Sequence, residues 1–270
     1  MKHTVYLTVL AIFLTCNPFA FAADPVPPST AGILSILSGP STQVRVFGLM
    51  GARSVPNQGP VFVGDKIKTE EEQTAMIQLA DGSEITIAAK SEMTLGKFVH
   101  SPAENSADIE LKKGMLFNVV KKNVYSEKKP FTIRTASAAM GVRGTEFVVE
   151  NSDQGITSLH TLKGSVAIAK SAQELSRLKG GVLIEAGKMS SATQKSNPTE
   201  PKIFNLKTYS AYLAEKAPVL AQRVEHQQKS DRVNHDTPAE KKNGSKTKDA
   251  TPPKKPHPKP KSANSKSATK

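Results

Sequence analysis

Short runs in which apolar and polar residues alternate, each closed by a turn, dominate the middle of this sequence. In the clearest pair, residues 75–79 alternate before Asp81-Gly82 and residues 84–87 alternate after it. A period of two places successive side chains on opposite faces of a strand, and Asp-Gly between two such runs predicts a β-hairpin. Val, Ile, Leu and Thr recur while tryptophan is absent, so we expect many brief strands rather than long helices.

Further turns repeat along the same region. Gly64-Asp65 marks one of them, and a Leu-Lys-Gly sequence recurs at Leu111-Lys112-Lys113-Gly114, Leu162-Lys163-Gly164 and Leu178-Lys179-Gly180. Units of this kind bury their apolar faces only by stacking on one another, and their irregular spacing argues against a long regular solenoid. The sequence predicts an all-β domain over residues 44–192, with short strands in a compact solenoid-like or twisted β-sandwich arrangement.

The first 22 residues read as a secretory signal peptide. An apolar run from Val5 to Thr15 precedes an Ala20-Phe21-Ala22 cleavage pattern. The alternative, a membrane anchor, is disfavoured because a spanning helix needs about 20 apolar residues. Lipidation at Cys16 is the lesser alternative, since the residues before it do not fit that pattern; removal of the signal leaves no cysteine for disulfides, metal sites or catalysis. We expect export across the inner membrane and a periplasmic or envelope-associated location.

The segments around the β domain differ in composition from it. Residues 23–43 are interpreted as a linker, and residues 193–228 as a second linker with a helix from Asn205 that Pro218 kinks or splits. A further helical turn is expected at Ser171 to Leu178. Residues 229–270 hold eleven Lys and one Arg against three Asp and one Glu, a net charge of +8, and have no apolar cluster, so we expect a disordered basic tail.

The charge of the tail suggests its partners. Lysines attract anionic envelope polymers such as peptidoglycan or acidic lipid head groups. Nucleic acid is not expected, because the tail lacks the interleaved aromatic residues that stack on bases and the signal peptide removes the chain from that compartment. A purely solubilising appendage is the alternative.

The run from Ser137 to Phe147 is the main candidate site. Its glycines permit a tight crossing or a bulge, and they flank one arginine. Two alternatives follow for Arg143: it pairs with an acid such as Glu146 inside the fold, which we favour, or its planar fork holds an anionic group of a ligand. The motif comprises Gly141, Val142, Arg143, Gly144, Thr145, Glu146 and Phe147, and the turn motif Gly64, Asp65, Asp81 and Gly82.

Sequence patterns for enzyme chemistry are missing. His100 and His160 lie far apart in the sequence, without the spacing that places two imidazoles on one metal, and no nucleophile elbow, phosphate loop or dinucleotide fingerprint occurs. We therefore expect no catalytic residues, no metal and no cofactor. An envelope hydrolase remains the least favoured alternative.

Taken together, "VGDKIKT", "AMIQLADGSEITI", "FTIRTASAAMGVRGTEFVV", "LKGSVAI" and "IEAGKM" resemble the FecR domain of periplasmic regulators of ferric citrate transport. The resemblance spans roughly residues 44–192 and implies a non-catalytic all-β domain that passes a signal or binds a partner in the periplasm. We expect an exported binding or sensing module that contacts a periplasmic or outer-membrane protein, with the tail as a tether and without being an integral membrane protein. The alternative is a signal-transduction component that relays through a separate membrane protein.

Overall fold

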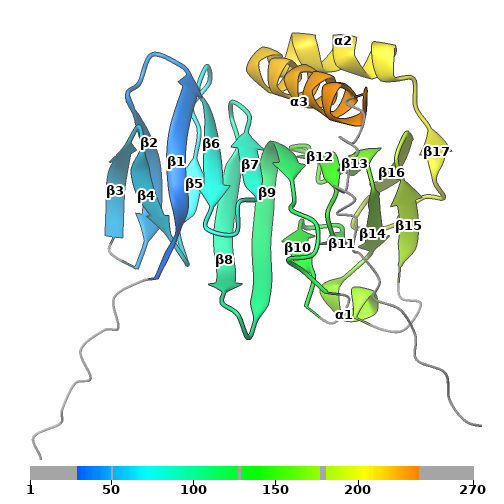
Figure 1. The fold of residues 1–270 in the computed structure, drawn as a ribbon, viewed down its shortest axis with the longest axis horizontal. Coiled ribbons are helices and arrows are strands. Elements are labelled where there is room, and N and C mark those ends of the chain that lie inside the picture. Colours follow the sequence, from blue (N-terminus) through cyan, green and yellow to red (C-terminus); the bar gives the residue numbers. More distant parts are fainter. Residues whose placement is uncertain (1–28, 50, 127–128, 177–180, 237–270) are drawn as a thin grey trace, which may run out of the picture. The chain divides into compact units, whose positions relative to one another are not determined.

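The computed structural model describes residues 29–236 except 50, 127–128 and 177–180. The expected signal peptide at residues 1–22 and the tail from residue 237 lie outside the described part. Contacts divide the chain into two units, residues 1–228 and 229–270. The first unit is mostly strands, which confirms the predicted all-β class (Figure 1).

The strands form two sheets, A and B, that share one long strand, β9. Sheet A has the antiparallel order β4 (Gly59–Phe62), β1 (Thr30–Ser38), β6 (Thr74–Leu79), β7 (Glu84–Ile87), β9 (Asn105–Val119), β12 (Glu146–Asn151), β13 (Thr157–Lys163), β16 (Lys188–Ala192) and β17 (Lys202–Ile203). Sheet B has the order β3 (Gly51–Pro56), β2 (Gln43–Gly48), β5 (Lys66–Lys68), β8 (Glu92–His100), β9, β10 (Phe131–Arg134), β11 (Ala139–Val142), β14 (Ser165–Ala169) and β15 (Val182–Glu185). Among the strands that the structure describes, β9 and β10 alone pair in parallel.

A bend in β9 allows it to serve both sheets. Its first half pairs with β8 and β10, and its second half pairs with β7 and β12. The bend lies at Gly114, whose φ of +93° belongs to the left-handed region that favours glycine. A Cβ at this position would lie only 2.2 Å from the Ser91 Oγ, so any larger residue would clash with Ser91, which directly precedes β8. The glycine of the first Leu-Lys-Gly repeat is thus required where the chain crosses between sheets.

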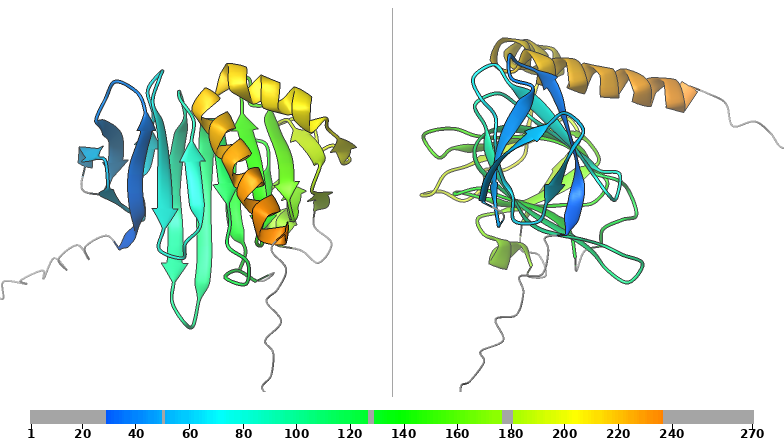
Figure 2. Two further views of the ribbon diagram at one scale, coloured as in Figure 1. Left: turned by 45° about the horizontal axis from the view of Figure 1, so that its top comes forward. Right: turned by 90° about the vertical axis from the view of Figure 1, so that its left-hand side faces the viewer.

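One continuous apolar core lies between the two sheets. Alternate residues of the predicted hairpin point into it: Ile77, Leu79, Ile85 and Ile87 are each at most 2% exposed. Seen along the long axis in Figure 2, the strands surround this interior on both sides. The period-two pattern therefore reports the inner face of each sheet correctly.

The domain begins earlier than the sequence predicted. β1 lies inside the expected linker of residues 23–43, between β4 and β6, and its Ala31 and Leu34 are fully buried. Gly32 allows the close approach, because a Cβ there would lie 2.4 Å from the Gln78 carbonyl oxygen. The sequence analysis missed this strand because Pro and Ser residues precede it and because Gly32 interrupts its alternation of apolar and polar residues.

Two helices cover the outer face of sheet A (Figure 2). α2 (Leu206–Lys216) begins with Asn205 as its N-cap, which accepts a hydrogen bond from the Thr208 N–H at 3.1 Å. α3 (Pro218–Asp236) follows after Ala217, so the proline divides the helical stretch as expected. α3 also continues eight residues into the segment expected to be disordered from residue 229, since no helix-breaking residue occurs before Pro238. In the sheet B half, α1 (Ala172–Leu175) occupies the predicted helical turn, with Ser171 as its N-cap.

The helices are an integral part of the β domain rather than a marginal connector. Their buried residues form a second apolar cluster with β9 and β12, comprising Ala88, Met115, Phe117, Val148, Tyr209, Leu213, Ala217, Leu220 and Val224. The Arg223 guanidinium pairs with Glu84 on β7 at 2.5 Å, and the Tyr212 hydroxyl donates to Glu150 on β12 at about 2.9 Å. Packing on the sheet compensates for the low stability of isolated helices of this length.

Candidate protein-binding surface

The predicted motif lies where the chain passes from sheet B to sheet A. β11 ends at Val142 and β12 begins at Glu146, so residues 143–145 make the crossing. Gly144 has a φ of +68°, and a Cβ there would lie 2.5 Å from the Lys122 Cγ and 2.9 Å from its Cα. Both properties exclude a larger residue without rearrangement. The glycine of this motif is therefore explained by the fold.

Arg143 does not occupy the buried position that we favoured. Its side chain is exposed, and no hydrogen bond or ion pair joins it to any part of the chain that the structure describes. The reason is its place in the bend between two strands, where the backbone leaves sheet B and the side chain faces solvent. The expected pairing with an acid inside the fold is wrong.

The rest of the motif serves the core and the crossing. Val142 and Phe147 are at most 1% exposed, and the Thr145 hydroxyl donates to the Ser165 carbonyl oxygen at 2.8 Å. Gly141 packs under α1, since a Cβ there would lie 3.1 Å from the Leu175 Cδ2. These residues hold the bend on which Arg143 is displayed.

Glu146 is buried and has partners other than Arg143. The Lys163 ammonium lies 3.3 Å from its carboxylate, and the Gln227 amide of α3 donates to it at 3.4 Å. The pairing of β12 with β13 shifts register between Glu146 and Phe147, where Leu162 of β13 is the extra residue, so this bulge lies in the partner strand and not at Gly144 as expected. The carboxylate thus links sheet A to the helix above it.

Four turns lie side by side at this crossing, and we call them the turn row: residues 81–83, 120–123, 143–145 and 163–165. The Lys121 N–H donates to the Ser83 hydroxyl at 3.1 Å, and the Val120 N–H donates to the Thr145 carbonyl at 3.0 Å. Gly164 packs on the next turn, because a Cβ there would lie 3.0 Å from the Gly144 carbonyl oxygen. The structure therefore brings Asp81-Gly82, the arginine motif and the second Leu-Lys-Gly repeat together.

The turn row presents positive charge. Lys121, Lys122 and Arg143 are exposed and Lys163 is half-buried beside Glu146. The other nearby carboxylate, Asp81, accepts a hydrogen bond from the Tyr125 hydroxyl at 2.6 Å. An exposed group of cations on a backbone fixed by glycines and hydrogen bonds is suited to contact with an acidic partner.

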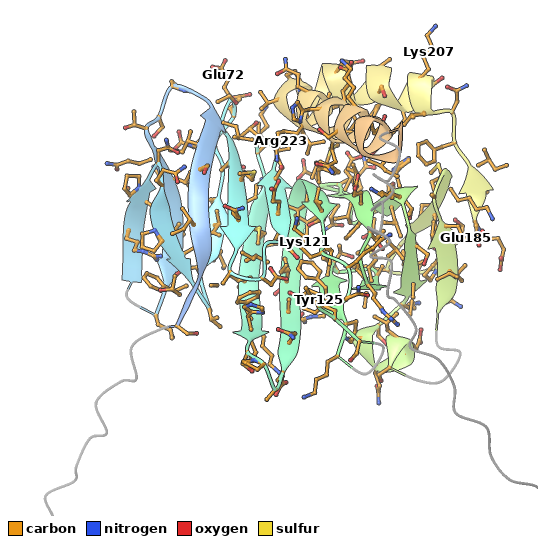
Figure 3. All side chains as sticks on the ribbon, viewed as in Figure 1. Glu72, Lys121, Tyr125, Glu185, Lys207 and Arg223 are labelled. Carbon is orange, nitrogen blue, oxygen red and sulfur yellow. The ribbon has the colours of Figure 1, made fainter. Side chains whose placement is uncertain are left out.

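Tyr125 anchors the loop that carries two of these lysines. Figure 3 shows Lys121 and Tyr125 on the loop that follows β9. The Tyr125 ring is 3% exposed and packs edge-on against Phe131, with ring centroids 5.4 Å apart. Burial, and then the hydrogen bond to Asp81, raise the pKa of its phenol, so the hydroxyl stays protonated and donates. The sequence pattern indicates Asp81 only as a turn residue and does not predict this anchoring role.

The other predicted turn, Gly64-Asp65, does not belong to the turn row. Asp65 is 2% exposed and accepts bonds from the Arg53 guanidinium at 2.8 and 2.5 Å and from the Phe62 N–H at 2.8 Å. Arg53 also lies over the Phe62 ring, 5.0 Å from its centroid. A buried arginine pair does exist in this fold, but it is formed by Arg53, which no sequence motif had marked.

The described residues show no arrangement typical of a metal centre. Within residues 29–236, outside the gaps named above, no group of three or more His, Cys, Asp or Glu side chains is placed to hold a metal ion. His100 contacts the Asn105 side chain at 2.7 Å, whereas His160 is stacked on Tyr209 with ring centroids 3.8 Å apart. Over the same residues, no helix has both the length and the apolar character needed to cross a membrane.

Part of the chain matches one family model. Residues 65–167 match the family model described as FecR protein, within the span of the predicted resemblance. No curated protein matches the chain. Two crystal structures of a proposed anti-sigma factor from Parabacteroides distasonis are similar to this chain at 17% identity and a TM-score of 0.43. The match covers 55% of this chain and 63% and 64% of the two solved chains, less than two thirds of their length.

Proposed function

We propose that this chain, whose residues 65–167 match the FecR protein family model, is a non-enzymatic signal-transduction regulator of the cell envelope that acts by contacting another protein. The observation that carries the proposal is the exposed Arg143 on the turn row. The neighbouring residues of the motif are buried or hydrogen-bonded within the domain, but the arginine side chain has no partner in the described structure. A planar guanidinium held on a fixed bend is well suited to bind a carboxylate of a partner protein.

The charges around Arg143 support contact with an acidic surface. Lys121 and Lys122 lie on the adjacent turn, and Gly144 packs directly on Lys122. Charged residues on an exposed rim mainly increase the association rate and specificity, whereas buried anchors supply most of the affinity. We therefore propose a moderate, salt-sensitive interaction, as suits a regulator that must release its partner.

Co-purification from envelope extracts tests this function. The full chain with Lys122→Gln and Arg143→Gln together should lose a protein partner that the wild type retains, while its melting temperature is unchanged. Lys195→Gln is the matched control, because it removes an exposed cation near the Thr193–Ser196 bridge. A partner retained equally by all three proteins would refute the role of the turn row.

We further propose export by the signal peptide of residues 1–22 and tethering by the basic tail to peptidoglycan or acidic lipid. The net charge of +8 over residues 229–270 supports attraction to such polymers, which salt would screen. Sedimentation with purified peptidoglycan, with and without residues 237–270, tests the tether. Loss of sedimentation on truncation and at high salt is the expected result; sedimentation that is independent of the tail would contradict it.

A further inference from the structure

We propose that the outer face of sheet B carries a second binding site, built around Glu92, for an extended acidic segment of a partner protein. Three lysines converge on this one carboxylate: Lys68 at 3.1 Å, Lys112 at 3.3 Å and Lys66 at 3.7 Å. The Glu92 side chain is 5% exposed, but the lysine side chains are 44–65% exposed. The cluster therefore presents an excess of positive charge over a buried anion.

A β-bulge at Lys112 places a fourth lysine, Lys113, opposite Glu92. In the pairing of β8 with β9, Glu92 lies opposite Lys113 and Met93 lies opposite Leu111, so Lys112 is the extra residue of the bulge. Both lysines are exposed. The first Leu-Lys-Gly repeat differs from the others by this doubled lysine, and the turn row does not use it. The bulge explains how two successive lysines reach the same carboxylate neighbourhood.

Glu92 organises the lysines but does not neutralise them. Burial acts to raise the pKa of Glu92, but the hydrogen bonds and charges of Lys68 and Lys112 outweigh burial and lower it, so the carboxylate stays ionised. Four lysines against Glu92 leave a net charge of +3 within the cluster, and the exposed Glu110 beside Lys112 reduces it to +2 over the wider patch. The patch can attract further carboxylates without first losing its own ion pairs.

The neighbouring residues give the site one apolar contact. Phe47 on β2 lies opposite Lys66 on β5, is 38% exposed and has the Lys68 ammonium 5.7 Å from its ring centroid. Within the described residues, α2 and α3 pack on sheet A and α1 packs on β11 and β14, so no helix covers β2, β5 and β8. The lysine cluster and the ring are open to a ligand together.

The spacing of the lysines favours an extended acidic segment. They lie on β5 and β9, on either side of β8, and two strand spacings amount to roughly 10 Å. Alternate side chains of an extended peptide are about 7 Å apart, a distance that flexible lysine stems can match. A membrane surface fits less well, because the exposed Glu110, opposite Thr94 and two residues from Lys112, would repel a uniformly anionic plane, whereas a narrow peptide can contact the lysines alone.

Carbodiimide cross-linking of the full chain to a labelled peptide of alternating Glu and Val residues tests the proposal. We expect cross-links to Lys66, Lys68 or Lys112, and binding about two- to fivefold weaker for each of Lys68→Gln and Lys112→Gln. Lys97→Gln is the matched control, because Lys97 lies on the same sheet but pairs with Glu104. The same peptide with Gln in place of Glu should not bind.

Glu92→Gln provides the opposite test, because it releases the lysines and should strengthen peptide binding if the variant melts like the wild type. If it melts earlier, the two lysine variants decide the question. Cross-links confined to tail lysines, or equal effects of Lys68→Gln and Lys97→Gln, would overturn the proposal. Binding to phosphatidylglycerol vesicles that depends on Lys68, without peptide binding, would replace it with a membrane contact.

Discussion

Substitution by alanine should strongly destabilise the domain at Arg53 and hardly affect its stability at Arg143. Arg53→Ala leaves Asp65 buried with only the Phe62 N–H as a partner, whereas Arg143→Ala removes an exposed side chain without a partner in the described structure. Breaking a buried pair costs about 3–5 kcal/mol. We expect the lower end, about 3 kcal/mol, because the Arg53 side chain is 21% exposed and Asp65 keeps one hydrogen bond. Arg143→Ala should change stability by at most about 0.5 kcal/mol.

Urea unfolding followed by circular dichroism measures both effects, since the midpoint reports the free energy of unfolding at constant slope. Asp65→Ala combined with Arg53→Ala adds a coupling test: the double variant should lose less than the sum of the single losses, because it leaves no buried charge. The reasoning would be refuted if Arg143→Ala destabilised the domain as much as Arg53→Ala.

Three further perturbations test the packing. Burial lowers the pKa of His160 from 6.5 to about 4, so the unfolded state binds a proton that the folded state excludes. The free energy of unfolding should therefore be at its full value above about pH 6.5 and fall by about 1.4 kcal/mol per pH unit down to about pH 4. Urea titrations at several pH values measure this dependence, which His160→Phe should remove. Leu220→Ala should cost about 2–5 kcal/mol by leaving a cavity in the apolar cluster between the helices and sheet A, seen as a lower melting temperature; an unchanged melt would mean that α3 does not pack there. Gly114→Ala should destabilise through its φ of +93° and its clash with Ser91, and equal stability would argue against the bend in β9.

The sequence predicted those features that depend on local pattern. The hairpin at Asp81-Gly82 is readable because a tight turn and two alternating runs are contiguous, and Asn205 and Pro218 mark helix boundaries by their own backbone chemistry. The FecR resemblance is confirmed over residues 65–167. Strand β1 was missed because its partners, β4 and β6, lie far along the chain and its Gly32 interrupts the pattern.

The candidate site shows where sequence reasoning stops. Glycines around Arg143 correctly indicated a tight crossing, but the sequence does not say which side of a bend faces solvent, so the arginine was assigned to the interior. The pairing of Arg53 with Asp65 joins residues on different elements without a motif. The lysine cluster at Glu92 likewise depends on a bulge and on strand register, and neither can be predicted from the local sequence.

The central claim is that Arg143 serves contact with a partner protein rather than the fold. A photo-reactive amino acid placed at position 143 in the full chain, in cells or envelope extract, measures this most directly. Gln154 is the matched control position, since it is exposed in the turn beyond the other end of β12. We predict a discrete cross-linked protein from position 143 and none from position 154; equal labelling from both positions, or none from either, would contradict the account.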